Sequence, residues 1–368
     1  PSTMQLNRLK WETTTEYNTG LDASFLKGKL RFTVDVYQKY IKDLLQKKVK
    51  MPTSIGYGNG YEVSYMNSGK MTNKGWEFRV DAVPFENRDW RVGFYFNIAH
   101  NENKITEMPD NYTEENYTFN NGEYAYRREE GRPMGSFYGY RYKGVCQNKD
   151  ATYARDADGN VMKDISGNAI VMRNGTATIA PGDALYEDIN HDGVINQYDI
   201  VYLGNSNPRF TGGAGVNVSY KQFKLSAIFY GRYGQDVVNS TRLNNESMRG
   251  IDNQSTAVLR RWRNEGDQTD IPRALYGEGY NTLGSDRFVE DASYLRLKSL
   301  SFNYRLPKKI IQRWGFSNID VYVTGYNLFT WTKYTGQDPE VKTENTYARD
   351  SATTPASIQL VAGFNLSF

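Results

Sequence analysis

The final segment of the chain, 358–368, alternates between apolar and polar side chains with a period of two. One set of alternate positions reads Ile358, Leu360, Ala362, Phe364, Leu366 and Phe368. The other set is polar or small, except for Val361. Because successive side chains of a β-strand point to opposite faces, this segment predicts a strand with one apolar and one polar face. The same alternation recurs at 90–98 and 210–220.

The connections between the predicted strands fall into two kinds. Six further strands begin near positions 16, 29, 74, 223, 292 and 319, which makes nine long strands. Short turns lie at 27–29, 86–88 and 221–222, and 307–315 reads as a brief helical turn. The remaining connections are long and polar: 44–73, 101–207, 236–291 and 334–356. Short turns on one side and long loops on the other are typical of an outer-membrane β-barrel, whereas compact soluble domains rarely hold such loops.

The composition agrees with strands that show only one face to an apolar environment. Of the 368 residues, 39% are hydrophobic and 14% aromatic, and the mean hydropathy is −0.70. A membrane-spanning strand needs about 10 residues and presents only alternate ones to lipid. No apolar run approaches the roughly 20 residues of a membrane-spanning helix. The formal charge of +3 argues against a nucleic-acid binder.

Strand parity predicts that the chain is part of a larger barrel. Single-chain bacterial barrels close with an even number of strands, and nine is odd. The chain also begins at Pro1 rather than at a methionine, which fits processing or a longer parent protein. We therefore interpret 1–368 as the C-terminal segment of one all-β, antiparallel transmembrane barrel.

Two of the long connections are predicted to lie outside the cell. The interval 101–207 is interpreted as a long extracellular excursion. Its strand-like stretch 135–145 belongs there, because counting it as a spanning strand would break the alternation of short and long connections. The interval 236–291 is a long extracellular loop with a short helix at 255–264, begun by Ser255. Its arginines at 260, 261 and 263 could meet an acidic partner, although charge runs usually lie on solvated faces.

The sharpest local motif lies inside the excursion, where 188–199 reads D-I-N-H-D-G-V-I-N-Q-Y-D. Side-chain oxygens at positions 1, 3 and 5 of such a loop can converge on Ca²⁺, together with a carbonyl at position 7 and a carboxylate at position 12. The predicted ligands are Asp188, Asn190, Asp192, Val194 through its carbonyl, and Asp199. The alternative is an Asx-rich turn that binds no metal.

The many aromatic residues admit two interpretations. Those near strand ends fit the interfacial girdle of a barrel; they are Trp76, Trp90, Trp331 and Tyr334. Aromatic residues within loops are better candidates for stacking on a sugar ring or on a peptide side chain. These candidate ligand-binding residues are Tyr57, Tyr61, Tyr117 and Phe119.

Several segments together resemble the SusC-like TonB-dependent transporters of Bacteroidota. They are LKWETT at 9–14, NSGKMTNKGWE at 67–77, the Asp-rich loop through Phe210, FVEDASYLRLK at 288–298 and GYNLFTW at 325–331. The segments occur in family order and span nearly the whole chain. The terminal Phe368 resembles the aromatic assembly signal that outer-membrane insertion machinery reads.

The resemblance implies the last nine strands of a barrel of about 22 strands. The family's N-terminal plug and TonB-contacting segment are absent from this chain. It also implies TonB-dependent import of oligosaccharides or oligopeptides across the outer membrane of a Gram-negative bacterium. A SusD-like surface lipoprotein would close over the extracellular loops as a lid. The motifs do not distinguish a glycan from a peptide.

Two other functions stay open at the level of sequence. A passive porin or surface-binding barrel would lack the plug and the TonB-contacting segment upstream. A barrel enzyme would need a Ser/His/acid cluster, and the chain has only His100 and His191. It contains no P-loop, G-x-S-x-G or H-E-x-x-H motif, and its single cysteine, Cys146, excludes a disulfide framework. We therefore expect no enzymatic activity.

Overall fold

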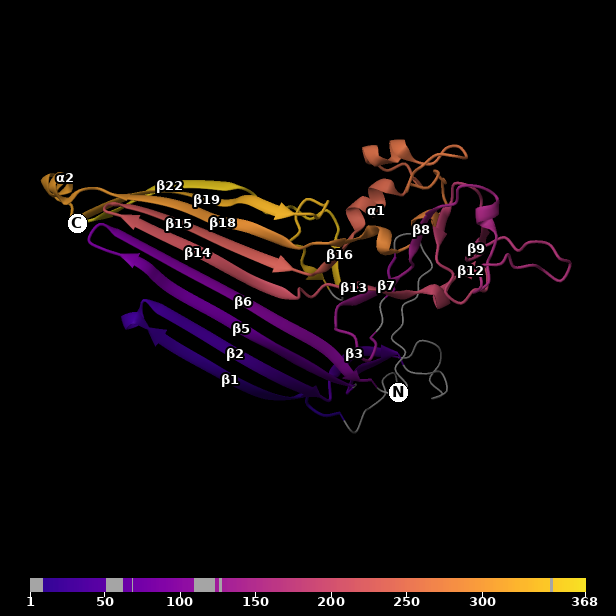
Figure 1. The fold of residues 1–368 in the computed structure, drawn as a ribbon, viewed down its shortest axis with the longest axis horizontal. Coiled ribbons are helices and arrows are strands. Elements are labelled where there is room, and N and C mark those ends of the chain that lie inside the picture. Colours follow the sequence, from indigo (N-terminus) through magenta and orange to yellow (C-terminus); the bar gives the residue numbers. More distant parts are fainter. Residues whose placement is uncertain (1–8, 51–61, 68, 109–122, 126–127, 345–346) are drawn as a thin grey trace.

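The computed structural model describes residues 9–50, 62–67, 69–108, 123–125, 128–344 and 347–368. In this part of the chain, nine long strands form one antiparallel sheet whose order follows the sequence (Figure 1). They are β1 (Thr13–Phe25), β2 (Leu30–Lys42), β5 (Lys70–Glu86), β6 (Trp90–Glu107), β14 (Phe210–Tyr220), β15 (Phe223–Tyr233), β18 (Tyr294–Arg305), β19 (Asn318–Thr332) and β22 (Gln359–Ser367). The predicted all-β class and strand number are confirmed.

Short and long connections are sorted to opposite ends of the sheet, as the sequence predicts (Figure 1). The short turns lie at one end and include the helical turns η1 (Leu26–Gly28), α2 (Lys308–Ile311) and η8 (Gln312–Trp314). The long loops gather at the other end. β6 continues toward the loops past β14, which pairs with it only as far as His100, and stays paired with β5 as far as Lys70 and Glu107. The excursion after β6 therefore starts beyond residue 107 rather than at 101.

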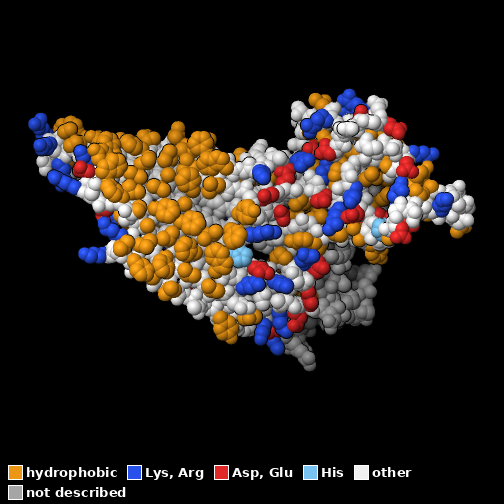
Figure 2. Space-filling model, viewed as in Figure 1, with side chains coloured by type: hydrophobic (Ala, Val, Ile, Leu, Met, Phe, Trp, Pro, Cys, Tyr) orange, Lys and Arg blue, Asp and Glu red, His pale blue; other side chains and the backbone are white. Residues whose placement is uncertain are grey.

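The register divides the sheet into an apolar and a polar face, because directly paired residues share a face. Figure 2 shows the apolar face, where hydrophobic side chains cover the strands and charged side chains gather toward the loops. Phe302 is 46% exposed and Phe364 is 67% exposed on this face. The opposite rows are polar; one runs from Asn217 through Ser226 and Ser301 to Thr324. Val361, the exception in the sequence pattern, pairs with Thr324 in this polar row.

The long loops fold into a layer with its own small strands. These strands are β3 (Leu45–Lys50), β4 (Glu62–Asn67), β7 (Ser136–Gly139), β8 (Tyr142–Val145), β9 (Arg173–Asn174), β10 (Ala177–Thr178), β11 (Ala184–Tyr186), β12 (Val194–Ile195), β13 (Val201–Asn205), β16 (Asp236–Asn239), β17 (Val289–Asp291), β20 (Thr343–Glu344) and β21 (Tyr347–Asp350). The helices in the loops are η3 (Asp150–Thr152), η4 (Gln197–Asp199), α1 (Ser240–Glu246), η5 (Thr256–Arg260), η6 (Tyr280–Thr282) and η7 (Asp286–Phe288). None of the described helices has the length and hydropathy needed to cross a membrane.

Most of the best-buried side chains belong to this loop layer rather than to the sheet. Phe137, Tyr138 and Phe288 are fully buried. One core cluster joins Tyr138 and Tyr140 to Leu283, and a second joins Phe137 to Phe288. Because each cluster combines residues of 101–207 with residues of 236–291, the two predicted extracellular segments fold as one unit.

Local predictions in the loops were partly correct. The stretch 135–145 forms β7 and β8, which pair with β13 and β11 outside the large sheet. The helix predicted at 255–264 is a shorter 3₁₀ turn, η5, with Ser255 as its N-cap. It ends at Arg260 because Asp267 accepts the N–H groups of Arg263 and Asn264, which turns the chain. α1 was not predicted.

The girdle prediction fails for Tyr334. This side chain is only 6% exposed and packs in a loop cluster with Val237 and Ala292. Its hydroxyl donates to Asp350 Oδ2 at 2.6 Å, which satisfies the polar end of the ring inside the loop layer. Trp90 and Trp331 are exposed, as a girdle requires.

Candidate functional site

The polar face of the sheet carries charges of both signs in cross-strand and same-strand pairs. Thr33 Oγ1 donates to Asp22 Oδ1 at 2.6 Å, and the Arg79 guanidinium donates to both oxygens of Asp81 at 2.7 and 2.8 Å. Hollows of about 670 and 380 Å³ lie over this face. Exposed pairs of this kind contribute only about 0–1 kcal/mol each to stability. They provide a wall of donors and acceptors for a polar ligand.

The hollows have distinct linings. The larger one lies over Asp22, Arg31, Arg79 and Asp81 near the turn between β1 and β2. The smaller one lies nearer the loops and is lined by Glu16, Asp35, Tyr37, Lys39 and Glu77 among others. The alternation of cations and anions along neighbouring strands would suit a ligand that itself carries both charges.

Arg296 ties the last long loop to this wall. The residue is only 2% exposed on β18. Its guanidinium donates to Thr330 Oγ1 and to Glu340 Oε2, each at 2.9 Å, and to Asp338 Oδ1. Lys298 Nζ also lies 2.8 Å from Glu340 Oε2. The loop that connects β19 to β22 is therefore anchored by a buried arginine on the strand beside it.

The ionisation of Asp338 sets the pH range of this anchor. Burial works to raise its pKa, but hydrogen bonds from the Ala356 and Glu340 N–H groups and from Arg296 outweigh burial and lower the pKa. A carboxyl with a lowered folded-state pKa stabilises the fold above its unfolded pKa and loses that contribution as the pH falls through the folded value.

We expect amide hydrogen exchange in 333–358, corrected for intrinsic rates, to stay slow from about pH 8 to pH 5 and to accelerate below about pH 4, near the unfolded pKa of Asp. Hydrogen-exchange mass spectrometry across this range measures the effect. An Asp338→Asn variant should already exchange fast at neutral pH. Acceleration that begins near pH 6 would contradict the assignment to Asp338.

A second buried acid, Asp183, joins the two long loop segments 101–207 and 236–291. Asp183 is fully buried. Its carboxylate accepts Arg273 Nε at 2.7 Å, Asn281 Nδ2 at 3.1 Å and the Ala180 N–H at 2.8 Å. Arg273 in turn donates its backbone N–H to the Gly182 carbonyl. This network, which we call the loop latch (Asp183, Arg273 and Asn281), holds 101–207 against 236–291.

The predicted calcium loop is folded through Asx turns. The Gly193 N–H donates to Asp188 Oδ2 and the Val194 N–H to Asp192 Oδ1, each at 2.8 Å. Gly193 has a φ of 78°, which favours glycine at this turn. A carboxylate offers about four lone-pair sites, so Asp188 and Asp192 keep acceptor capacity for a cation. Asn190 Nδ2 donates to Asp192 Oδ2 at 2.9 Å.

Asp199, the predicted ligand at position 12, has a structural role of its own. It is 1% exposed, and burial raises the pKa of its carboxyl. Its two oxygens accept the Ile189 and Asn196 N–H groups at 2.8 Å each, closing a capping box at η4. Among the residues that the structure describes, no group of three or more His, Cys, Asp or Glu is arranged to hold a metal. Calcium binding stays a prediction.

We expect an Asp188→Ala, Asp192→Ala double variant to bind Ca²⁺ at least about tenfold more weakly, the effect of losing about 1.4 kcal/mol of ligand interaction. Calcium titration calorimetry of the full-length protein measures it. Asp156→Ala with Asp164→Ala is a matched control, because both residues form exposed Asx turns outside the motif. Equal calcium content in both double variants would exclude the site.

The other predicted site residues differ in whether the structure describes them. Tyr57, Tyr61, Tyr117 and Phe119 lie outside the described residues. Phe368 is 89% exposed, and its ring lies 4.9 Å from that of Phe316. Its role as an assembly signal stays a prediction. Sequence reasoning missed Arg296 and Asp183, whose partners are 42 and 90 residues away.

Comparison with known proteins gives a consistent result. A family model described as TonB dependent receptor-like, beta-barrel matches residues 1–328. TonB-dependent receptor P3 of Formosa agariphila is 32% identical over 92% of this chain, and TonB-dependent receptor SusC of Bacteroides thetaiotaomicron is 27% identical over 98%. The solved RagAB peptide transporter superposes on 97% of this chain with a TM-score of 0.70 and 27% identity. The chain covers 32% of each of these receptors and 36% of the RagAB chain, about a third of their length.

Proposed function

Because the chain belongs to the family of TonB-dependent receptor-like β-barrels, we propose that it forms part of the wall of an active nutrient importer. TonB-dependent receptors are outer-membrane proteins, which places the chain in that membrane with its apolar face toward lipid. The family comprises receptors and transporters rather than enzymes. The observation that carries the proposal is the polar wall on the opposite face, where charged pairs border two hollows. A passage for hydrophilic solutes needs such a wall.

The imported ligand is an oligopeptide or an oligosaccharide, and the wall favours the oligopeptide. Arg31, Arg79 and Lys39 alternate with Asp22, Asp81 and Glu16 on neighbouring strands. An oligopeptide carries both charges at its termini and side chains, so it can pair with such a surface, whereas a neutral glycan cannot. The likeness to the RagAB peptide transporter supports the same choice.

The partner is a SusD-like surface lipoprotein that meets the loop layer. The support is the likeness to SusC and to RagAB, together with the loop layer itself. The loop latch and the shared core clusters make 101–207 and 236–291 one folded body, which offers a preformed platform for a lid. Energy coupling runs through TonB and segments that lie outside this chain.

Uptake in the native bacterium tests the proposal. We expect uptake of labelled oligopeptides by cells that produce the full-length transporter to fall to background when TonB is depleted. Uptake that continues without TonB would identify a passive porin instead. Uptake of an oligosaccharide but not of oligopeptides would keep the importer and overturn the choice of ligand.

A double substitution on the polar face tests whether the ligand passes along it. Arg79→Gln with Asp81→Asn removes an ion pair from the polar face and should lower peptide uptake roughly five- to tenfold, equivalent to about 1–1.4 kcal/mol. Lys74→Gln with Glu102→Gln removes a similar exposed pair, 3.0 Å apart, from the apolar side and serves as a control. Equal uptake by both double variants would argue against a ligand path along this wall.

A further inference from the structure

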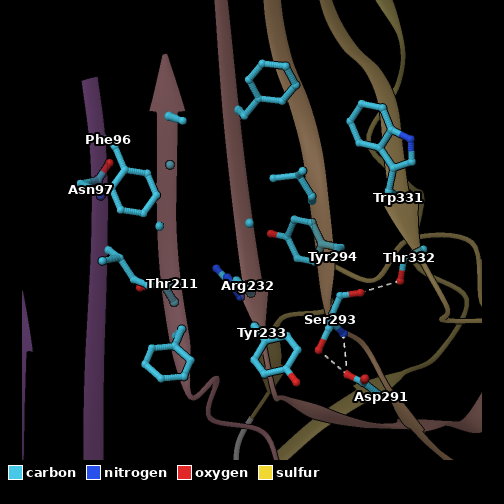
Figure 3. A pocket seen from close by; sticks show the side chains of 18 of the residues that line it. Phe96, Asn97, Thr211, Arg232, Tyr233, Asp291, Ser293, Tyr294, Trp331 and Thr332 are labelled. Atoms are coloured by element: carbon cyan, nitrogen blue, oxygen red, sulfur yellow. Dashed lines mark hydrogen bonds between the residues drawn. The ribbon is translucent and has the colours of Figure 1, made fainter. Parts of the chain in front are cut away.

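The apolar face contains a hollow that the transport function does not use. It has a volume of about 650 Å³ and lies at the loop-side ends of β6, β14, β15, β18 and β19 (Figure 3). This volume lies within the range of about 300–1,000 Å³ typical of small-molecule sites. Its side walls are rings and branched chains from different strands, including Phe96, Phe229, Tyr233, Leu295 and Trp331.

The hollow exists because its floor has no side chains. Gly212 of β14 and Gly231 of β15 pair directly with each other. A Cβ at Gly212 would collide with the Asn97 carbonyl oxygen, and one at Gly231 would lie 2.8 Å from the Tyr294 carbonyl oxygen. Glycines inside strands often mark a close approach of backbones. Here they leave a depression between projecting aromatic side chains.

The position of this depression on the apolar face indicates which molecule can occupy it. Gly212 pairs with Ile98 and therefore lies on the apolar face of the sheet. In a β-barrel of this family, the apolar face is in contact with lipid. The Trp331 and Tyr233 side chains around it are 53% and 61% exposed. Water does not populate the hydrocarbon region, so an apolar hollow there is filled by hydrocarbon.

The mouth of the hollow carries a cation. Lys333 lines it and is exposed directly after the loop-side end of β19. Asp291 also lines the hollow, where its carboxylate accepts the N–H and the hydroxyl of Ser293 (Figure 3), so two cations, Lys333 and Arg232, line the hollow together with this one anion. Arg209 is exposed at the adjoining end of β14 and donates its N–H to the Tyr233 carbonyl. An ammonium at the interface attracts an anionic headgroup.

We propose that this hollow is a lipid site that holds one acyl chain of an anionic, phosphate-bearing lipid, with the phosphate beside Lys333. The aromatic side chains around the hollow contact the acyl chain, and the glycines at its floor leave space for it. The Lys333 ammonium attracts the anionic headgroup. The site is independent of the imported ligand, because it lies on the opposite face of the sheet from the polar wall.

Photo-crosslinking tests the site. The full-length transporter with its partner lipoprotein is placed in nanodiscs that contain phosphatidylglycerol with a photoreactive diazirine in its acyl chain. Crosslinked peptides are then identified by mass spectrometry. We expect crosslinks to concentrate on strands β14, β15 and β19 around the hollow, at least about fivefold above the rest of the apolar face, because a pocket retains its ligand longer than an open surface does.

Matched variants separate a site from bulk lipid. Ala214 lines the hollow, whereas Ala227 is equally half-buried in the next row of the same face and does not. Ala214→Leu should lower crosslinking at the hollow about fivefold by filling it, while Ala227→Leu should leave it unchanged. Lys333→Glu should lower crosslinking of the phosphatidylglycerol probe more than that of a phosphatidylethanolamine probe, because the ammonium of phosphatidylethanolamine offsets its phosphate. Even crosslinking over the whole apolar face, or equal effects of the two Leu variants, would overturn the proposal.

Discussion

Replacement of Asp183 by Ala is expected to destabilise the loop layer by about 3 kcal/mol, because it leaves the Arg273 charge, which is 34% exposed, and two further donors without their acceptor. Asp183 is fully buried and is bound by Arg273, Asn281 and the Ala180 N–H. Without the carboxylate, these donors lose their acceptor inside the protein. We therefore expect the contact between 101–207 and 236–291 to open while the nine-stranded sheet persists.

Hydrogen-exchange mass spectrometry of the full-length protein measures this opening. Exchange should accelerate around residues 180–184 and 271–281 and stay unchanged in β14 and β15. Asp150→Ala is the matched control, because its bond to Arg155 at 2.8 Å is a surface pair with Asp150 71% exposed, and such pairs contribute about 0–1 kcal/mol. Identical exchange in the two variants would show that the loop latch does not hold the segments together.

Replacement of Arg296 by Ala is expected to release the loop between β19 and β22 at a cost of about 3 kcal/mol, for the same reason. The arginine is 3% exposed at its side chain, and Asp338 and Glu340 both depend on it. Lys298 would still pair with Glu340, whereas Asp338 would lose its cation. Because this loop lies beside the polar wall, we also expect slower uptake of the imported ligand.

Two further variants make the Arg296 result interpretable. Arg305→Ala removes a similar pair with Asp320, but Arg305 is 64% exposed, so the loss should be about 0–1 kcal/mol. Arg296→Lys keeps the charge but not the planar fork that reaches several acceptors, so it should fall between the two. Thermal unfolding in detergent and exchange in 333–358 measure the series. A loss from Arg305→Ala as large as that from Arg296→Ala would contradict the role of burial.

The sheet could be predicted in detail because each strand carries its own signal. Alternation in 90–98, 210–220 and 358–368 specified which side chains share a face, and turn lengths specified which strand ends lie together. Val361 breaks the alternation but does not shift the pairing of β22 with β19, because the residues before and after it in the chain keep the same register. These signals are local, and in a sheet ordered as the chain runs, local signals also determine the neighbours.

The loop layer could not be predicted in the same way. Tyr334 carries the signature of a girdle residue, yet Asp350 accepts its hydroxyl in a buried cluster. The helix expected at 255–264 stops early because Asp267 turns the chain. The Asp-rich motif was found from its spacing, but its Asp199 serves as a cap, a role that depends on the fold around η4.

The amino-acid pattern was sufficient for the all-β class, the nine strands, their order and the side of the sheet that faces lipid, because a period of two and a turn length are properties of neighbouring residues. The folded structure was needed to find which distant groups meet, such as Asp183 with Arg273 and Arg296 with Asp338. Burial and ion pairing depend on what lies nearby in space, and a carboxylate or a guanidinium in the sequence does not indicate its distant partner.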